Sequence, residues 1–130
     1  MKTSLLIIFI LTIIWVVNPL VTSAQDPDKS SENYILSDKQ AKSQTKAMVM
    51  LLNLNEPVRI DVYKINLKYQ LLTNSLRLGT TPIAEKIEMH ANIDEQKNAE
   101  LKSTLTAEQY HKYILLLENA KTQLNTRVKR

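Results

Sequence analysis

Two histidines, His90 and His111, are the only imidazoles in the sequence and its best candidates for metal binding. His90 and Asp94 lie four residues apart in a segment with a helical pattern, so they would share one helix face and could share a metal ion. A complete site would need further ligands, which Glu85 or Glu88 at a dimer seam could supply. A solvated helix face explains the pair better, and we predict no metal and no cofactor.

Catalytic chemistry has few candidate residues here. The 130-residue chain has no Cys and a single Gly. These counts exclude thiolate nucleophiles, Cys-based zinc sites, Gly-rich phosphate loops and the G-x-S-x-G nucleophile elbow. The adjacent carboxylates of Asp94 and Glu95 point apart on a helix. Residues 110–113 could suggest a reactive cluster, but a packed Tyr110 and an exposed His111 explain this segment better. We therefore predict that the protein is not an enzyme.

The charged residues carry a modest excess of positive charge. There are 17 Lys and Arg against 13 Asp and Glu, a net charge of +4, and the basic residues are spread among acidic ones. This distribution does not indicate nucleic-acid binding. Exposed cations could favour encounter with acidic partners, although a solubilising surface charge is an equally simple explanation. The candidate cations lie on the second predicted helix: Arg59, Lys64, Lys68 and Arg77.

Residues 1–24 have the pattern of a secretory signal peptide. Lys2 precedes an apolar run over residues 5–17, and the small residues Thr22 and Ala24 precede an expected cleavage before Gln25. The run is shorter than the roughly 20 residues that a transmembrane helix needs, and Pro19 follows it. An uncleaved anchor helix is the alternative. We expect export, with membrane contact only through this segment before its cleavage.

The rest of the chain predicts an all-α domain of four helices over residues 37–125. It follows a flexible leader (25–36) and precedes a basic tail (126–130). The first helix is expected over residues 38–52, with Ser37 and Gln40 forming a capping box. The second begins after Asn55 and ends at residue 78, the third spans 82–103, and the fourth ends near residue 124.

The breaks between these helices have recognisable cap residues. We expect the single glycine, Gly79, to end the second helix in the left-handed conformation. Thr81 is expected to cap the third helix, with Pro82 in its first turn. Asn55 and Pro57 suit the start of the second helix in the same way.

The second helix has two apolar stripes. The first repeats every four and three residues, as in a coiled-coil seam: Val58, Val62, Ile65, Tyr69, Leu72 and Leu76. The second lies on another face: Ile60, Leu67, Leu71 and Leu78. Burial between neighbouring helices explains both stripes, and a dimer interface or an apolar binding face is the alternative.

The start of the fourth helix is a second predicted capping box. Thr106 is placed to cap the helix with Gln109 at its third position, and Leu105 can pack on Tyr110 as a hydrophobic staple. Leu54-Asn55 precedes the second helix in a similar way, 51 residues earlier. The two starts suggest an internal repeat of helix pairs.

The L-T-x-x-Q motif at Leu105–Gln109 resembles that of small periplasmic proteins of the Spy/CpxP type. The wider pattern is similar to short exported Bacteroidetes-type proteins of that superfamily, in the segments 52–55, 62–69 and 100–113. The resemblance covers about residues 46–117. The first motif departs from the pattern, with Asn55, Pro57 and Val58 at its variable positions, so its capping box is incomplete.

The resemblance implies an all-α protein of elongated helical hairpins, forming a cradle-like antiparallel dimer. It implies a periplasmic chaperone or envelope-stress adaptor that binds unfolded or envelope proteins. We expect the apolar contacts to come from Ile60, Leu67, Leu71, Leu115 and Leu116, rimmed by the four basic residues of the second helix. A metal sensor or buffer using His90 and Asp94 is one alternative, and a purely structural helical protein is another.

Overall fold

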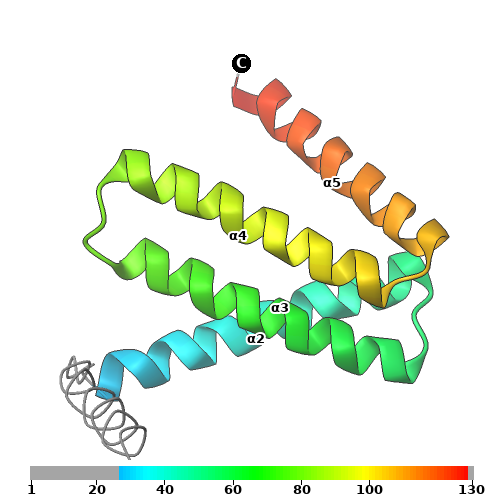
Figure 1. Ribbon diagram of the computed structural model, residues 1–130, viewed down its shortest axis with the longest axis horizontal. Helices are drawn as coiled ribbons and strands as arrows, with labels where there is room; N and C mark the ends of the chain where they lie inside the picture. The colour runs from blue at the N-terminus through cyan, green and yellow to red at the C-terminus, as the bar shows by residue number, and fades with distance from the viewer. Residues whose placement is uncertain (1–26, 129–130) are drawn as a thin grey trace, which may run out of the picture. The chain divides into compact units, whose positions relative to one another are not determined.

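The computed structural model describes residues 27–128, and these residues form four α-helices and no strands. The helices are α2 (Pro27–Leu52), α3 (Glu56–Leu78), α4 (Ile83–Thr104) and α5 (Ala107–Val128) (Figure 1). The all-α prediction is thereby confirmed, whereas the predicted signal peptide lies outside the described residues. Within the described range, none of the helices has the length and apolarity required to cross a membrane. The chain divides into two compact units after Ser31, and the larger unit, from Glu32 onward, contains all contacts considered below.

Helix α2 begins at Pro27, well before the expected start at residue 38. The predicted capping box is wrong, because Ser37 lies in the middle of α2 and is fully buried. Its hydroxyl donates to Asn33 Oδ1 at 3.2 Å and accepts from Asn74 Nδ2 at 2.9 Å. Gln40 Oε1 accepts a second hydrogen bond from Asn74 at 2.8 Å. Both residues therefore join α2 to α3 instead of capping a helix end.

The interface between α2 and α3 contains many neutral polar side chains. Ser37, Ala41 and Thr45 repeat every four residues along α2 and are all buried, so three small side chains share one face of this helix. Asn66 Nδ2 donates to Thr45 Oγ1 at 3.0 Å, and Gln44 Nε2 donates to Gln70 Oε1 at 3.1 Å. Hydrogen bonds thus specify how α2 lies on α3.

The predicted seam of α3 forms much of the hydrophobic core. Val62, Ile65, Tyr69 and Leu76 are buried, and Val58 is partly buried against the core. Leu72, at 44 % exposure, is the exception. Residues from the other helices and from two of the three connections complete the core: Met48, Leu52, Leu54, Leu101, Leu105 and Tyr113. Burial of apolar surface is the main stabilising term for such a cluster.

The residue that takes up the left-handed conformation is not the one that we expected. Gly79 does end the helix, with its N–H bonded to the Ser75 carbonyl, but its φ of −72° is not left-handed. The left-handed residue is Asn53, with φ of 53°, directly after α2. Asn tolerates this conformation better than other residues that carry a Cβ atom, so Asn53 has the role that we expected of the glycine.

The start of α4 also differs from expectation. The helix begins at Ile83 with Pro82 at the cap position, and no side chain caps it, so the predicted role of Thr81 is wrong. Lys86, in the first turn, donates instead to the Arg77 and Gly79 carbonyls at 3.1 and 2.8 Å. Its ammonium therefore satisfies the free carbonyls at the end of α3.

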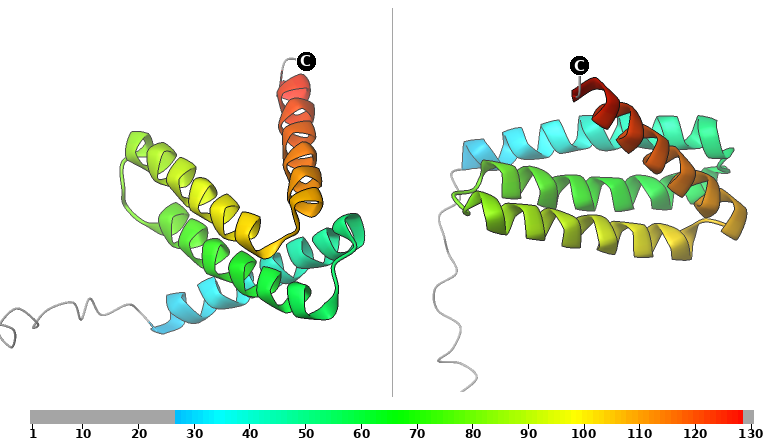
Figure 2. Two further views of the ribbon diagram at one scale, coloured as in Figure 1. Left: turned by 45° about the vertical axis from the view of Figure 1, so that its right-hand side comes forward. Right: turned by 90° about the horizontal axis from the view of Figure 1, so that it is seen from above.

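Helix α5 packs through its first half only. Tyr113 is buried and donates from its hydroxyl to Asn98 Oδ1 of α4 at 3.2 Å. Residues 118–128 are exposed along their whole length. Figure 2 shows that α5 diverges from α4 as it leaves their connection.

Candidate polypeptide-binding groove

The predicted capping box at the start of α5 is present. Gln109 N donates to Thr106 Oγ1 at 3.2 Å, and Thr106 N donates to Gln109 Oε1 at 3.1 Å. Leu105 is buried, and Tyr110 packs against the same core, as a hydrophobic staple requires. The three fixed residues of the motif and the adjoining Tyr110 therefore all have a structural role at this helix start.

The similar segment before α3 forms a simpler cap, with a single side-chain hydrogen bond. Asn55 Oδ1 accepts from Val58 N at 3.1 Å, and Val58 has no polar side chain that could return the bond. Leu54 is buried in the same cluster as Leu105. Gln109 Nε2 also donates to the Leu52 carbonyl at 3.4 Å, so the two connections lie together and the motif holds them in place.

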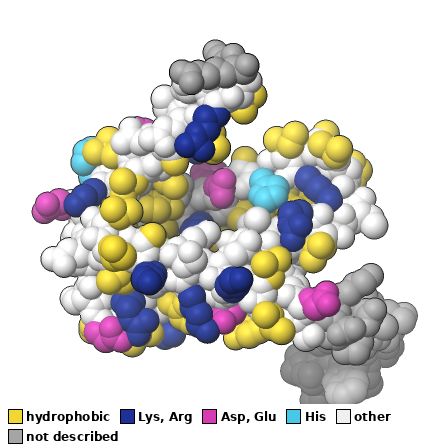
Figure 3. Space-filling view, turned by 180° about the vertical axis from the view of Figure 1, so that it is seen from behind, with side chains coloured by type: hydrophobic (Ala, Val, Ile, Leu, Met, Phe, Trp, Pro, Cys, Tyr) yellow, Lys and Arg dark blue, Asp and Glu magenta, His cyan; other side chains and the backbone are white. Residues whose placement is uncertain are grey.

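A groove of about 280 Å³ lies between α2 and α3, close to these connections. Val49, Met50 and the Tyr63 ring supply its apolar surface. Its remaining lining residues are Lys42, Thr45, Lys46 and Arg59. Figure 3 shows Lys and Arg side chains spaced among hydrophobic ones on the face opposite to that of Figure 1. An apolar groove with cations at its rim can bind a chain segment that combines aliphatic and acidic side chains.

Two of the three cations at the rim already have carboxylate partners. Lys42 Nζ lies 2.7 Å from Asp38 Oδ2, and Arg59 pairs with Glu56 at 2.5 Å. These pairs lower the pKa of both carboxyl groups and raise the pKa of both cations. Lys46 has no ion pair within the described residues, so the rim keeps one positive charge in excess.

Tyr63 connects the groove to this charge pattern. Its hydroxyl donates to Asp38 Oδ1 at 2.5 Å. The hydrogen bond to a carboxylate, together with partial burial, raises the pKa of the phenol to about 12. The hydrogen bond to Asp38 also holds the Tyr63 ring along the groove.

The predicted apolar contact residues fall into two groups. Ile60 is 40 % exposed, whereas Leu67 and Leu71 are half-buried; their spacing of seven and four residues puts all three on one stripe of α3. On α5, Leu115 is exposed and Leu116 packs against the core.

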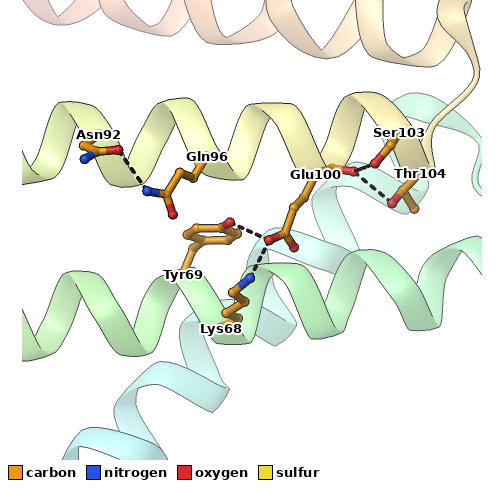
Figure 4. A network of polar contacts seen from close by, with 7 residues as sticks. All are labelled: Lys68, Tyr69, Asn92, Gln96, Glu100, Ser103 and Thr104. Atoms are coloured by element: carbon orange, nitrogen blue, oxygen red, sulfur yellow. Dashed lines mark hydrogen bonds and ion pairs between the residues drawn. The ribbon is translucent and has the colours of Figure 1, made fainter.

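The predicted cations are also divided. Arg59 lines the groove, while Lys64 and Arg77 are exposed elsewhere on α3. Lys68 instead forms an ion pair with Glu100 of α4, and Glu100 accepts a second hydrogen bond from the Tyr69 hydroxyl at 2.6 Å (Figure 4). Both contacts lower the pKa of Glu100. Lys68 therefore holds α3 to α4 and is not part of the groove.

The metal-binding candidates are not extended into a larger cluster. Among residues 27–128, no group of three or more His, Asp or Glu side chains could hold a metal ion. His90 is half-buried and Asp94 exposed on α4. Within the described residues, the structure therefore adds no third ligand to His90 and Asp94.

Sequence reasoning missed most residues of the groove. Lys42, Lys46 and Val49 are spaced by four and three residues, which puts them on one face of α2 and could have indicated a mixed surface. Their position beside Tyr63 depends on the pairing of α2 with α3, which local spacing does not specify.

Comparison of the chain with protein-family models, with curated proteins and with solved structures found no match. The groove is therefore interpreted from its own residues.

Proposed function

We propose that this protein is an exported, non-enzymatic polypeptide-binding protein of the periplasm. Its function is that of a chaperone or an envelope-stress adaptor, and it acts as a dimer. The observation that carries the proposal is the groove between α2 and α3, with Val49 and Met50 on its surface and Lys46 at its rim. The resemblance of Leu105–Gln109 to the L-T-x-x-Q motif supports the same class of function.

Unfolded chains expose aliphatic side chains that folded proteins bury, and apolar surface is what such a binder recognises. Met50 is 75 % exposed beside the groove, and its flexible thioether can adapt to varied side chains. Leu51 and Ile60 extend the exposed apolar surface around the same end of α2 and α3. The excess charge at Lys46 favours segments that also carry a carboxylate.

This proposal is tested by measuring whether the purified protein suppresses aggregation of an unfolding client protein. We expect protection near equimolar ratio, and at least a several-fold loss of protection in a Met50→Ser, Ile60→Ser double variant. Leu78→Ser is the matched control, because Leu78 is a similarly exposed aliphatic residue at the far end of α3. Absence of protection by the unmodified protein, or equal protection by the double variant, would overturn the proposal.

A further inference from the structure

Helices α4 and α5 both expose large aliphatic residues in their diverging halves. Ile83 and Ile87 of α4 are 78 % and 66 % exposed, and Leu124 and Val128 of α5 are 60 % and 85 % exposed. Single exposed aliphatic residues are common, whereas a set aligned on two helices marks a contact surface.

These four residues continue the stripes through which α4 and α5 already touch. The hydrogen bond between Asn98 and Tyr113 marks the point of contact. Ile87 lies eleven residues before Asn98, and Leu124 lies eleven residues after Tyr113, while Ile83 and Val128 lie fifteen residues away. Eleven and fifteen residues are close to three and four helical turns. An antiparallel contact in this register pairs Ile87 with Leu124 and Ile83 with Val128.

One copy of the chain does not make this contact within itself, because other interactions hold the N-terminal half of α5. Leu105 and Tyr113 are buried in the core, and Leu116 packs against it. Gln109 also bonds to the Leu52 carbonyl. Swinging α5 down onto α4 would disturb these contacts, so the missing partner must come from another molecule.

The charges beside the stripes are complementary. On α4, Glu85, Glu88, Asp94 and Glu95 are exposed. The second half of α5 exposes Lys121 and Arg127 beside one carboxylate, Glu118, so its charge is net positive. Asp94, Glu95 and Lys121 line one open crease of about 580 Å³ between the two helices. Acidic residues of one helix would therefore meet basic residues of the other in the same register.

We propose that a second copy of this chain covers these stripes. The second half of α5 of one copy packs on the first half of α4 of the other, and a twofold axis makes the contact twice. The inference rests on the dimer included in the proposed function and names its interface, but it does not depend on client binding at the groove.

The absence of Cys from the sequence allows a direct test. An Ile87→Cys chain is mixed with a Leu124→Cys chain and oxidised, because a disulfide forms only between residues whose Cα atoms approach within about 7 Å. We expect a covalent dimer of the two different chains. The control pairs Leu124→Cys with Met50→Cys, which lies off both stripes, and we expect no such product. Equal yields from both pairs would overturn the proposal.

The mass in solution gives a second readout. We expect twice the chain mass by light scattering, and a single-chain mass for Leu124→Asp with unchanged helix content. A single-chain mass for the unmodified protein would overturn the inference. So would an intrachain disulfide in the Ile87→Cys, Leu124→Cys double variant, which would mean that α5 closes on its own α4. Client protection with a monomeric protein would remove this inference and the dimer of the proposed function, but would leave the groove. A correct dimer without protection would remove the proposed groove alone.

Discussion

The buried side-chain amide oxygen of Asn66, Oδ1, accepts no hydrogen bond within the described residues. Its amide donates to Thr45 Oγ1 at 3.0 Å, and Thr45 donates its own proton to the Ala41 carbonyl at 2.7 Å. Thr45 can therefore only accept a hydrogen bond from Asn66. Exchanging the oxygen and nitrogen of the Asn66 amide would not give its oxygen a donor. An unsatisfied buried acceptor destabilises the folded state by about 1–3 kcal/mol.

We expect Asn66→Leu to raise the free energy of unfolding by about 1 kcal/mol. Leu has the same branching as Asn, and its methyl groups would face Met48 and leave no buried donor without a partner. Chemical denaturation followed by circular dichroism measures the change. Asn74→Leu is the matched control and should destabilise, because Asn74 donates to both Ser37 and Gln40. The explanation fails if the two variants shift stability in the same direction.

Lys97 is the second residue with a local energetic cost. It is half-buried on α4, and Nζ donates to the neutral Gln44 amide at 3.1 Å. Loss of hydration lowers the pKa of its ammonium below 10.5, although the Asp94 carboxylate opposes this shift. The unfolded chain then binds more protons than the folded one between the lowered pKa and 10.5, so stability rises with pH across that window.

Replacing Lys97 by Met should therefore stabilise the protein at neutral pH, by about 1 kcal/mol. The gain should shrink as pH rises toward 10.5, where the lysine of the unmodified protein is neutral in the folded state. Thermal melting of both proteins at several pH values measures this trend. A constant difference between them at all pH values would rule out desolvation as the cause.

At the scale of elements, local sequence made three helices predictable, and correctly predicted caps account for two of them. The expected third helix, 82–103, differs by one residue at each end from Ile83–Thr104, and Asn55 and Thr106 cap α3 and α5 as expected. Helix α2 was not predictable in the same way. Its polar first half, from Glu32, is held by hydrogen bonds to α3 such as Asn33 to Ser75 at 2.9 Å. Such contacts have no signature in the local sequence, and the groove depends on them.

The conformation of Asn53 gives a prediction for the turn between α2 and α3. A residue with φ of 53° and a plain Cβ is strained by roughly 1–2 kcal/mol relative to Gly. We expect Asn53→Ala to lower the free energy of unfolding by about 1 kcal/mol and Asn53→Gly to leave it nearly unchanged. Denaturant titration of both variants provides the measurement.

Gly79→Ala serves as the comparison for this turn. The backbone there is extended, and the added Cβ would lie 3.3 Å from the Ser75 carbonyl oxygen. Its effect would come from this close contact and not from a left-handed backbone. If Asn53→Gly destabilised as much as Asn53→Ala, conformational strain would not be the reason for asparagine at this turn.

At the scale of the whole molecule, tyrosines link the separate helix contacts. Tyr63 joins α3 to α2 through Asp38, Tyr69 joins α3 to α4 through Glu100, and Tyr113 joins α5 to α4 through Asn98. Each donates its phenolic proton, so loss of that proton removes the contact. Ionisation of the tyrosines should therefore disturb all the helix pairs over one range of pH.

That range follows from the pKa values. The hydrogen bond to Asp38 raises the pKa of Tyr63 to about 12, and burial raises that of Tyr113 to about 12, against 10.0 for an unperturbed tyrosine. Between these values the folded chain holds protons that the unfolded chain has lost. The stabilisation that these tyrosines contribute is therefore fully present below pH 10 and falls as pH rises toward 12. The gain from Lys97 ends by 10.5 and cannot offset this fall.

We expect helix content and tyrosinate absorbance to change together between pH 10 and 12. Tyr113→Phe should make stability less dependent on pH in this range, because Phe has no proton to lose, and Tyr63→Phe should act in the same way. Tyr34→Phe is the control, since Tyr34 is 51 % exposed on α2. The alkaline transition would need another cause if all three variants kept the midpoint of the unmodified protein.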